Sequence, residues 1–514
     1  MSDTDAAKTR HWMAPVLVAL IGAFMSILDT SIVNIAIPTI MGIFNASTSN
    51  AQWVVTAYLL ALGVVVPLSG WLGDRLGFKT LYIASMGLFV FGSMLCTLSW
   101  SLTSLITARV IQALGGGLLM PTTMAMVFRM VPKEKFGTAM GIFGLSLLVA
   151  PAIGPTLGGY LVEYVDWRWI FTINLPIGVV GILLSFAILP DFPVKAVGRL
   201  DFGGALTAAG GLFALLLALS KGSDWGWSSE RVVILLYLSV TLLALFAYIE
   251  LTSPEPLLDL RVFKYPAFTF ANLTIIITTI GMYAGLFYVP LFLQTIRGLG
   301  ALQTGLLMMP GALASAVMMP IVGRLYDKIG PRILVIFGLA LLAVLTFDFH
   351  YLNLQTTWST ITLWIILRGL VMAFANMPAQ TSALADIPNE LIGRASAMTN
   401  IITRVASSFG IAVLTTILNH RTIEHSARMA ASLTPWNPAV IGFFGRFAQA
   451  TGESVSASKG MATAYLQGTV AKHAFVQGID DVFLIAAGLT VFGIVPALFL
   501  KRAERSVPGG AAAD

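Results

Sequence analysis

Charged residues are scarce in this chain: of its 514 residues only 11% are Asp, Glu, Lys or Arg, and 57% are hydrophobic. This composition excludes a soluble domain, because a folded core cannot hide that much apolar surface. Apolar runs of about 20 residues, enough for a helix to cross about 30 Å of hydrocarbon, recur along nearly the whole length. The alternating pattern of a membrane β-barrel is missing. We therefore predict an all-α integral membrane protein surrounded by lipid.

Cysteine is nearly absent as well. The single Cys96 excludes an intrachain disulfide and a cysteine metal site. The sequence also lacks a P-loop lysine motif, a His-Glu-x-x-His pair and a serine nucleophile elbow. The net charge of +6 comes without a basic stripe that alternates with aromatic residues. We therefore expect no enzyme activity, no metal site, no bound cofactor and no nucleic-acid partner.

Fourteen apolar segments are predicted as membrane spans. They cover approximately residues 13–38, 51–72, 80–99, 102–128, 137–163, 168–190, 200–220, 231–251, 267–294, 302–325, 331–350, 358–384, 394–420 and 481–501. An even number of spans places both termini on one side, and the loops on that side carry most of the Lys and Arg residues. The positive-inside rule therefore predicts a multi-pass protein of the cell (inner) membrane with both termini cytoplasmic.

A repeated motif divides the chain. Residues 67–79 read PLSGWLGDRLGFK, and residues 320–332 read PIVGRLYDKIGPR, 253 positions later. The offset pairs spans 2 and 3 with spans 10 and 11, which indicates two six-span halves separated by two additional spans. The predicted parts are an N-terminal bundle (1–190), the two additional helices (191–260), a C-terminal bundle (261–502) and a disordered tail (503–514).

Residues 421–480 form a long polar segment inside the C-terminal part, and the topology places this segment outside the cell. It contains two amphipathic stretches, IGFFGRFAQA and MATAYLQGTVAKHAFV. Such stretches favour a segment that lies on the outer membrane surface or caps the exit of a transport path. A disordered linker is the alternative.

Five stretches carry a family resemblance. They are LDTSIVNIAIP (28–38), GWLGDRLGFK (70–79), LITARVIQALGGG (105–117), the glycine and proline pattern of 141–159, and WRWIFTINLPIG (167–178). With these motifs the chain resembles the major facilitator superfamily, and within it the fourteen-span drug/proton antiporters of the EmrB/QacA type. Phe78, Ala113 and Ala150 depart from the residues usual in those motifs.

The resemblance implies two six-helix bundles plus two extra transmembrane helices. It also implies proton-coupled multidrug efflux of hydrophobic or amphiphilic, drug-like compounds by alternating access, driven by the proton gradient without a cofactor. In a cell with two membranes it further implies a periplasmic adaptor. Uptake or facilitated transport of a polar metabolite on the same fold is the alternative.

Asp29 and Arg109 are the predicted proton-coupling residues. Asp29 lies about 24 Å into the first span, where a carboxylate costs several kcal/mol unless it is paired, hydrated or protonated. Arg109 lies at a comparable depth in the fourth span, so the two side chains are expected to pair. A packing aspartate satisfied by Thr30, Asn34 or a neighbouring span, or a static ion pair, is the alternative.

Two further sets of residues are predicted. The substrate-binding candidates are polar, aromatic and methionine side chains near mid-membrane: Asn34, Tyr283, Phe287, Met308, Trp364, Met377, Gln380, Asn400 and Arg404. The gating candidates are the charges of the repeated loops, expected to form cytoplasmic latches, and the small or bending residues of the fifth span: Asp74, Arg75, Lys79, Asp327, Lys328, Arg332, Gly141, Gly154, Pro155, Gly158 and Gly159. For Arg368, snorkelling or pairing with helix carbonyls competes with a binding role.

Overall fold

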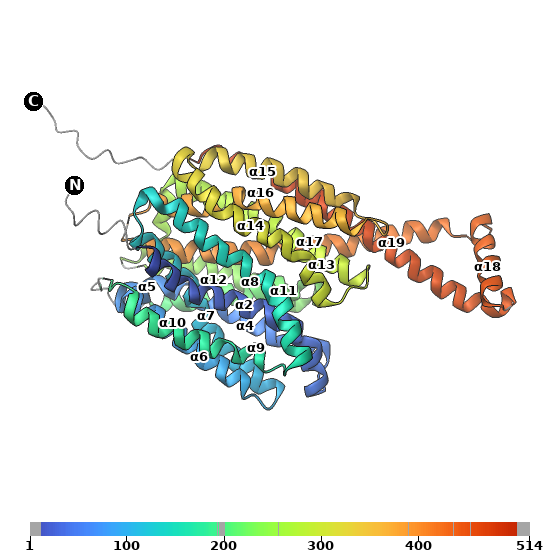
Figure 1. Ribbon diagram of the computed structural model, residues 1–514, viewed down its shortest axis with the longest axis horizontal. Coiled ribbons are helices and arrows are strands. Elements are labelled where there is room, and N and C mark those ends of the chain that lie inside the picture. The colour runs from blue at the N-terminus through green and yellow to red at the C-terminus, as the bar shows by residue number, and fades with distance from the viewer. Residues whose placement is uncertain are drawn as a thin grey trace, which may run out of the picture.

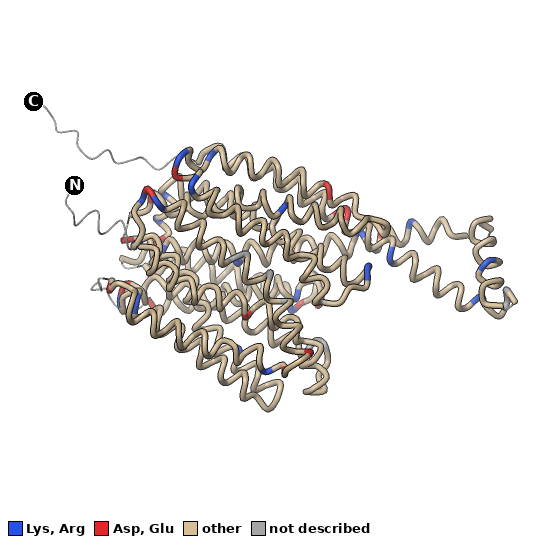
Figure 2. The backbone as a smooth tube through the Cα atoms, viewed as in Figure 1, with Lys and Arg blue, Asp and Glu red and all other residues tan. Residues whose placement is uncertain are grey.

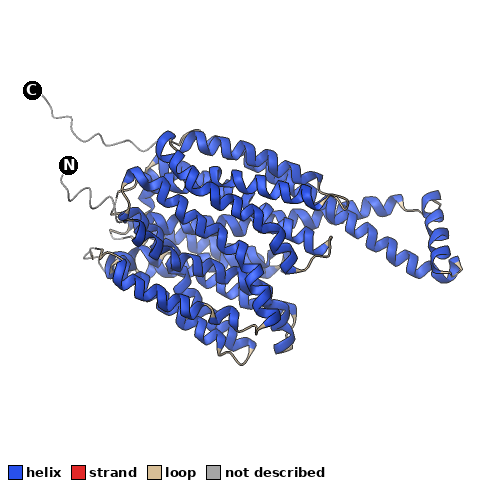
Figure 3. Ribbon diagram, viewed as in Figure 1, coloured by secondary structure: helices blue, strands red, loops and turns tan. Residues whose placement is uncertain are grey.

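The computed structural model describes residues 12–192, 194, 201–254, 256–388, 390–434, 436–452 and 454–500. Every regular element in these ranges is a helix (Figures 1 and 3). Thirteen helices are long and apolar enough to cross a membrane, and a pair bent by 57° makes a fourteenth span. The prediction of an all-helical protein with fourteen spans is therefore confirmed. The predicted tail, 503–514, lies outside the described residues.

The N-terminal half contains six spans. Its helices are α2 (Met13–Phe44), the short α3 (Thr48–Ala51), the bent pair α4 (Trp53–Val65) and α5 (Leu68–Leu76), α6 (Phe78–Thr97), α7 (Leu102–Met130), α8 (Phe136–Tyr164), and α9 (Trp169–Thr172) followed by α10 (Asn174–Ile188). The two additional spans are α11 (Phe202–Trp225) and α12 (Glu230–Thr252). They pack against each other, and α11 also contacts α4 and α17.

The C-terminal half repeats this pattern with longer helices near its end. Its helices are α13 (Pro266–Thr295), α14 (Ala301–Ile329), α15 (Pro331–Asp348), α16 (Trp358–Ala385), α17 (Ile392–Ser432), α18 (Pro438–Thr451), α19 (Val455–Phe492) and α20 (Ile494–Ala497). The two halves meet where α14 packs on α8 and where α17 packs on α5 and α7. These two crossings use spans that the repeat relates to one another.

The repeated motif folds alike in both halves. Gly77 separates α5 from α6 with φ +82°, and Gly330 separates α14 from α15 with the same φ. A side chain is strained at such an angle, so glycine is required for this sharp turn between consecutive spans. The shared turn supports the duplication inferred from the sequence.

The ends of the bundle differ. The first and last described residues lie at the end where Figure 1 marks N and C, which we call the termini end. In Figure 2, Lys and Arg gather with Asp and Glu in the loops there. At the opposite end α17 and α19 continue past the bundle and are joined by α18, and we call this projection the hairpin (Figure 1).

The hairpin differs from the expectation for residues 421–480. The described residues of this segment are mostly helical and project away from the bundle, so the segment neither lies along the surface nor forms a loose linker. Its base is held by Asp481, which hydrogen-bonds to His425 at 2.8 Å and forms an ion pair with Arg421 at 3.5 Å. At its tip, Phe443 of α18 stacks on Tyr465 of α19 with ring centroids 6.1 Å apart. The predicted span limits at 420 and 481 therefore fall inside continuous helices.

Candidate functional site

A fully buried ion pair lies inside the N-terminal half. Asp29 on α2 and Arg109 on α7 approach to 2.5 Å between Oδ2 and Nη1, and neither side chain has exposed surface. A charge buried in this way costs several kcal/mol unless it is paired and hydrogen-bonded. The structure thus brings together the two residues that were expected to pair.

Two amide side chains complete the pair. Gln112 donates to Asp29 Oδ1 at 2.9 Å and to Ser93 Oγ at 2.6 Å, while its own oxygen accepts from Arg109 Nη1 at 2.6 Å. Asn174 of α10 donates to the same Asp29 oxygen at 3.1 Å. The carboxylate therefore receives donors from two other spans, which fix its position. Sequence reasoning did not assign these amides, although both lie inside the motifs that carry the family resemblance.

Arg109 is also held from the α4 side. Its Nε donates to the carbonyl of Val54 at 3.3 Å, and its guanidinium lies 3.7 Å from the centroid of the Tyr58 ring. Phe171 of α9 adds a second ring at 5.7 Å. Cation–π contacts of this kind are strongest when desolvated. Arg109 therefore keeps favourable contacts even when the Asp29 carboxylate is neutralised.

A second arginine lies on α17 in the C-terminal half. Arg404 of α17 lies within electrostatic reach of Tyr58 and of Tyr283 on α13. Its Nε is buried without a hydrogen-bond partner, and among the described residues no carboxylate pairs with it. One turn earlier, Asn400 lies 3.8 Å from the sulfur of Met124 on α7. This face of α17 therefore lines the contact between the halves.

The other substrate-binding candidates are dispersed. Trp364 packs on Phe349 with centroids 5.4 Å apart, inside the core cluster of the C-terminal half, and Met308 packs against the same cluster. Met377 is buried, whereas Phe287 and Asn34 are exposed. Gln380 donates to Asn376 on its own helix at 2.7 Å. Of the nine candidates, Asn400 and Arg404 lie one turn apart on α17, and Tyr283 of α13 is an electrostatic neighbour of Arg404.

The repeated loops connect the halves at the termini end. Asp327 Oδ1 accepts from the backbone N–H of Gly137 at 2.9 Å, and Oδ2 accepts from the N–H and hydroxyl of Thr138 at 3.2 and 2.9 Å. Asp327 belongs to α14 and the donors open α8, so a carboxylate of one half caps a helix of the other. We call this contact the Asp327 latch.

The first copy of the motif lies at the related crossing. A methyl group added at Gly70 of α5 would lie 3.2 Å from the backbone nitrogen of Arg394 on α17, and one added at Gly323 would lie 2.3 Å from the oxygen of Gly137. Asp74 is buried and accepts from Arg129 at 3.4 Å. Backbones therefore meet closely at both crossings because glycine occupies the contact.

The charged neighbours of the two aspartates make contacts of their own. Arg75 lies 4.8 Å over the Trp71 ring, and Lys79 pairs with Asp191 at 3.1 Å. Lys328 and Arg332 are exposed. Asp74 pairs with Arg129, and Asp327 accepts from backbone donors and from the Thr138 hydroxyl. Arg129 lies in the last turn of α7 and is not among the gating candidates.

The fifth-span glycines divide between two partners. A methyl group at Gly141 would lie 2.6 Å from the oxygen of Met319 on α14, whereas one at Gly154 or Gly158 would meet α2 at Ser31 or Ile32. Gly159 makes only ordinary contact, 3.8 Å from Leu302. The side chain of Pro155 lies outside what the structure describes. Close approach to the other half therefore occurs at Gly141, toward the termini end.

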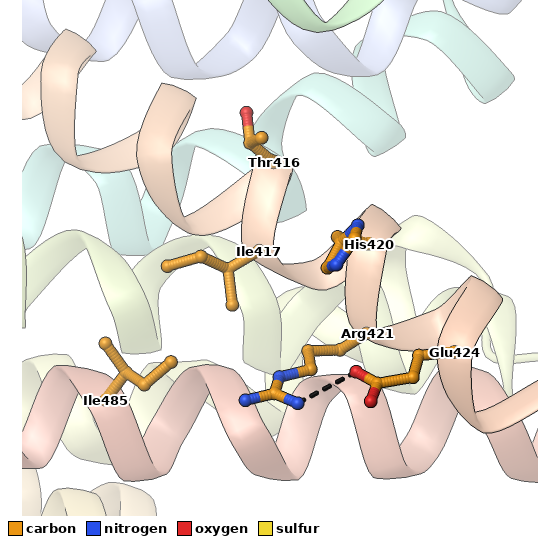
Figure 4. A pocket seen from close by; sticks show the side chains of 6 residues that line it. All are labelled: Thr416, Ile417, His420, Arg421, Glu424 and Ile485. Carbon is orange, nitrogen blue, oxygen red and sulfur yellow. Dashed lines mark hydrogen bonds and ion pairs between the residues drawn. The ribbon is translucent and has the colours of Figure 1, made fainter.

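A pocket opens at the base of the hairpin, between α17 and α19 (Figure 4). It is lined by Thr416, Ile417, His420, Arg421, Glu424 and Ile485. Arg421 is paired with Glu424 at 2.8 Å, so its charge is compensated there. The pocket lies about 18 Å along α17 from Arg404 and is separate from the buried pair.

Fourteen spans in two related halves, a buried ion pair and latches across the halves define a membrane transporter. Residues 19–411 match the family model of the Major Facilitator Superfamily. The chain belongs to the Major Facilitator Superfamily, as its motifs indicated.

Named relatives agree with this assignment. The chain is 34% identical over 509 residues to the MFS-type transporter YhcA of Bacillus subtilis (strain 168), covering 98% of this chain and 96% of that protein. It is 30% identical over 480 residues to the multidrug export protein EmrB of Escherichia coli (strain K12), covering 92% and 93%. Its fold matches the crystal structure of the human organic anion transporter MFSD10 (TETRAN) with a TM-score of 0.62 at 14% identity, covering 95% and 99% of the two chains.

Proposed function

We propose that this protein exports hydrophobic or amphiphilic compounds in exchange for protons by alternating access. The observation that carries the proposal is the buried Asp29–Arg109 pair, with no exposed surface on either side chain and with amide donors that fix the carboxylate. A pair placed this deeply in a membrane protein is costly and is typical of proton relays. The name of the relative EmrB, a multidrug export protein, supports the same reading.

Protonation of Asp29 changes the charge of the site. In the ionised state the carboxylate and the Arg109 guanidinium sum to zero; when the carboxylate takes up a proton, one positive charge is left. The cation–π contact with Tyr58 retains the arginine, but the ion pair is lost. A conformational equilibrium that responds to this added charge couples proton binding to movement of the halves.

The proposed orientation places the termini end in the cytoplasm, because Lys and Arg are concentrated in the loops there. The Asp327 latch and the close glycine crossings then hold the cytoplasmic side shut. Opening the latches and tilting the halves exposes the centre to the cytoplasm. In this orientation the hairpin lies outside, where the adaptor implied by the EmrB resemblance would dock in a cell with two membranes.

Dye accumulation in expressing cells tests the proposal. We expect lower accumulation of at least one of three dyes, the cation ethidium, the neutral Nile red or the anion 8-anilinonaphthalene-1-sulfonate. The difference is expected to vanish when the proton gradient is collapsed and in Asp29→Asn, which keeps the size of the side chain but cannot exchange a proton.

The matched control is Asp224→Asn, an exposed aspartate at the end of α11. Efflux that persists in Asp29→Asn with the same dependence on the proton gradient would show that the proton role is misassigned. Raised accumulation of the dyes in wild-type cells would instead indicate uptake.

A further inference from the structure

The structure assigns to α11, the first of the two additional spans, the role of a strap that joins the two halves at the end of the bundle opposite the termini end. We call that opposite end the hairpin end. The strap stays bound to the N-terminal half and releases α17 when the halves move. The inference rests on the proposed alternating access and gives the additional spans a part in it.

The N-terminal half and α17 meet directly near the start of α17. There Ser396 donates to the carbonyl of Pro121 on α7 at 3.0 Å. Further along α17, Val405 packs against a cluster that contains Leu60 of α4 and Leu216 of α11. Beyond this level α11 joins the two halves, since it contacts both α4 and α17.

The side of α11 that faces α4 is held by buried groups. A methyl group added at Gly63 of α4 would lie 2.4 Å from Leu216 Cδ1, so Leu216 fills the space that this glycine leaves open. Nearer the hairpin end, the buried Lys221 donates to Gln52 Oε1 at 3.2 Å, directly before α4 begins. Separation of α11 from α4 would expose apolar surface and break a hydrogen bond to a charged group. This side of the strap is therefore firmly bound.

The side of α11 that faces α17 is held by hydrogen bonds between neutral side chains. Trp227 Nε1, in the turn after α11, donates to Thr416 Oγ1 at 2.7 Å, and Asn419 Nδ2 donates to Ser223 Oγ at 3.0 Å. Asn419 is exposed and the other three residues are half-buried. Neutral hydrogen bonds near water contribute little, because water replaces the lost partner. α17 is therefore the side that separates from α11.

The turn after α11 holds the Trp227 indole in place. Gly226 has φ +84°, an angle that strains any side chain, and it turns the chain back toward α11. A methyl group added at Gly222 would lie 2.6 Å from Cη2 of Trp227, so the indole covers a glycine. The Thr416 hydroxyl donates to the carbonyl of Ala412 at 2.8 Å, which leaves its oxygen free to accept from the indole. Both partners of the Trp227–Thr416 bond are thus fixed before they meet.

The bonds to α17 stabilise the state in which the termini end is shut. They occur together with the Asp327 latch, at opposite ends of the bundle. In alternating access the halves tilt about the centre, so opening of the termini end displaces α17 relative to α4 at the hairpin end. The strap cannot follow both helices, and it stays with α4. Loss of the bonds to α17 therefore accompanies opening of the termini end.

Spin-label distances in the full-length protein in lipid nanodiscs measure the contribution of these bonds. Labels at Lys133→Cys and Arg332→Cys, both exposed at the termini end, report the separation of the halves without a substrate or a proton gradient, and the native Cys96 is buried. Trp227→Phe and Thr416→Val each remove one partner of the same hydrogen bond. We expect each to raise the ratio of open to closed termini ends about fivefold.

The double variant separates the hydrogen bond from effects of packing. Because both substitutions remove one shared bond, the double variant should also show about fivefold, whereas independent packing effects would multiply to about 25-fold. The matched controls are Trp436→Phe, at a tryptophan that is 86% exposed, and Thr241→Val, whose hydroxyl donates to a carbonyl of its own helix. Both controls should keep the wild-type ratio.

Cross-links between engineered cysteines show which side of α11 separates. A short bifunctional thiol reagent joins α11 to α17 through Ser223→Cys and Asn419→Cys, or α11 to the N-terminal half through Gln52→Cys and Lys221→Cys. We expect the first cross-link to abolish most dye efflux and the second to leave efflux as it was in the same protein before treatment. Efflux that survives the first cross-link would show that α11 does not release α17.

The outcomes separate this inference from the proposed function. If Asp29→Asn keeps proton-driven efflux, or if none of the three dyes is exported, the proposed function fails while the label distances still test the strap. If efflux behaves as proposed but Trp227→Phe and Thr416→Val keep the wild-type distances, the strap alone is overturned, as it is by a multiplied effect in the double variant. Each variant is first checked for wild-type elution and melting temperature, and Thr416→Val keeps the test valid if Trp227→Phe fails to fold.

Discussion

Replacing Asp327 with Asn tests the Asp327 latch. The carboxylate accepts three hydrogen bonds, at 2.9, 3.2 and 2.9 Å, from the first residues of α8. A hydrogen bond to a charged group contributes about 1.5–3 kcal/mol, and a negative charge at a helix N-terminus about 0.3–1 kcal/mol. Asn keeps one acceptor oxygen but loses the charge, so we expect the closed termini end to lose about 2–3 kcal/mol relative to the open form.

That loss is large enough to measure. About 1.4 kcal/mol changes an equilibrium tenfold, so the ratio of closed to open molecules should fall about 30- to 150-fold. Spin labels at Lys133→Cys and Arg332→Cys, both exposed at the termini end and called the reporter pair, should therefore move from a short to a long distance in Asp327→Asn at neutral pH. Proton-driven dye efflux should fall as well, because the open form exposes the site to the cytoplasm before substrate is released outside.

Lys328→Gln is the control for this prediction. Lys328 follows Asp327 directly and is exposed, so its replacement alters local charge without removing an acceptor from α8. Distances in Asp327→Asn that match those of Lys328→Gln and the wild type would refute the reasoning, since the cap would then contribute nothing to closure.

Three further substitutions have definite expected results. Gly323→Val places a side chain where a Cβ lies 2.3 Å from a backbone oxygen of α8, so it should hold the reporter pair apart and reduce efflux more than about tenfold. Gly87→Val, whose Cβ would have no atom within 4 Å, should leave the label distance and the efflux unchanged. Tyr58→Ala removes the ring that lies against the guanidinium of Arg109 and should abolish most proton-driven efflux. Tyr58→Phe keeps the ring and should keep the efflux. Equal losses of efflux in both variants would contradict a role for the cation–π contact. Asn174→Leu removes a donor to the buried carboxylate and should slow efflux about tenfold in a comparison at equal expression, and unchanged efflux would show that this donor is dispensable.

The membrane spans and their order could be predicted because the hydropathy signal is averaged over about 20 residues. A single polar residue in a span therefore does not hide it. The pairing of Asp29 with Arg109 could be predicted from depth alone, since few polar groups share the same level of the membrane. The amides of Gln112 and Asn174 were missed because neutral side chains give no charge signal, although they receive or donate the hydrogen bonds that fix the pair.

The latches show a different limit. The sequence identifies Asp327 as unusual, but it accepts from backbone N–H groups of the other half, and every residue except proline carries such a group. Residue type therefore gives no signal for this contact. Polar composition likewise predicts that residues 421–480 leave the membrane, but it does not distinguish a surface segment from two helices that extend straight out of the bundle.

The continuity of α17 has a mechanical consequence. This helix of 41 residues runs from the contact with the N-terminal half to the hairpin, a length of about 60 Å. A helix of this length that stays straight acts as a lever arm, so a tilt of the C-terminal half by about 10° would move its far end by about 10 Å. The hairpin tip would then sweep through a distance large enough to follow by fluorescence in single molecules. A small rearrangement around the buried Asp29–Arg109 pair would thereby produce a large displacement of the hairpin tip.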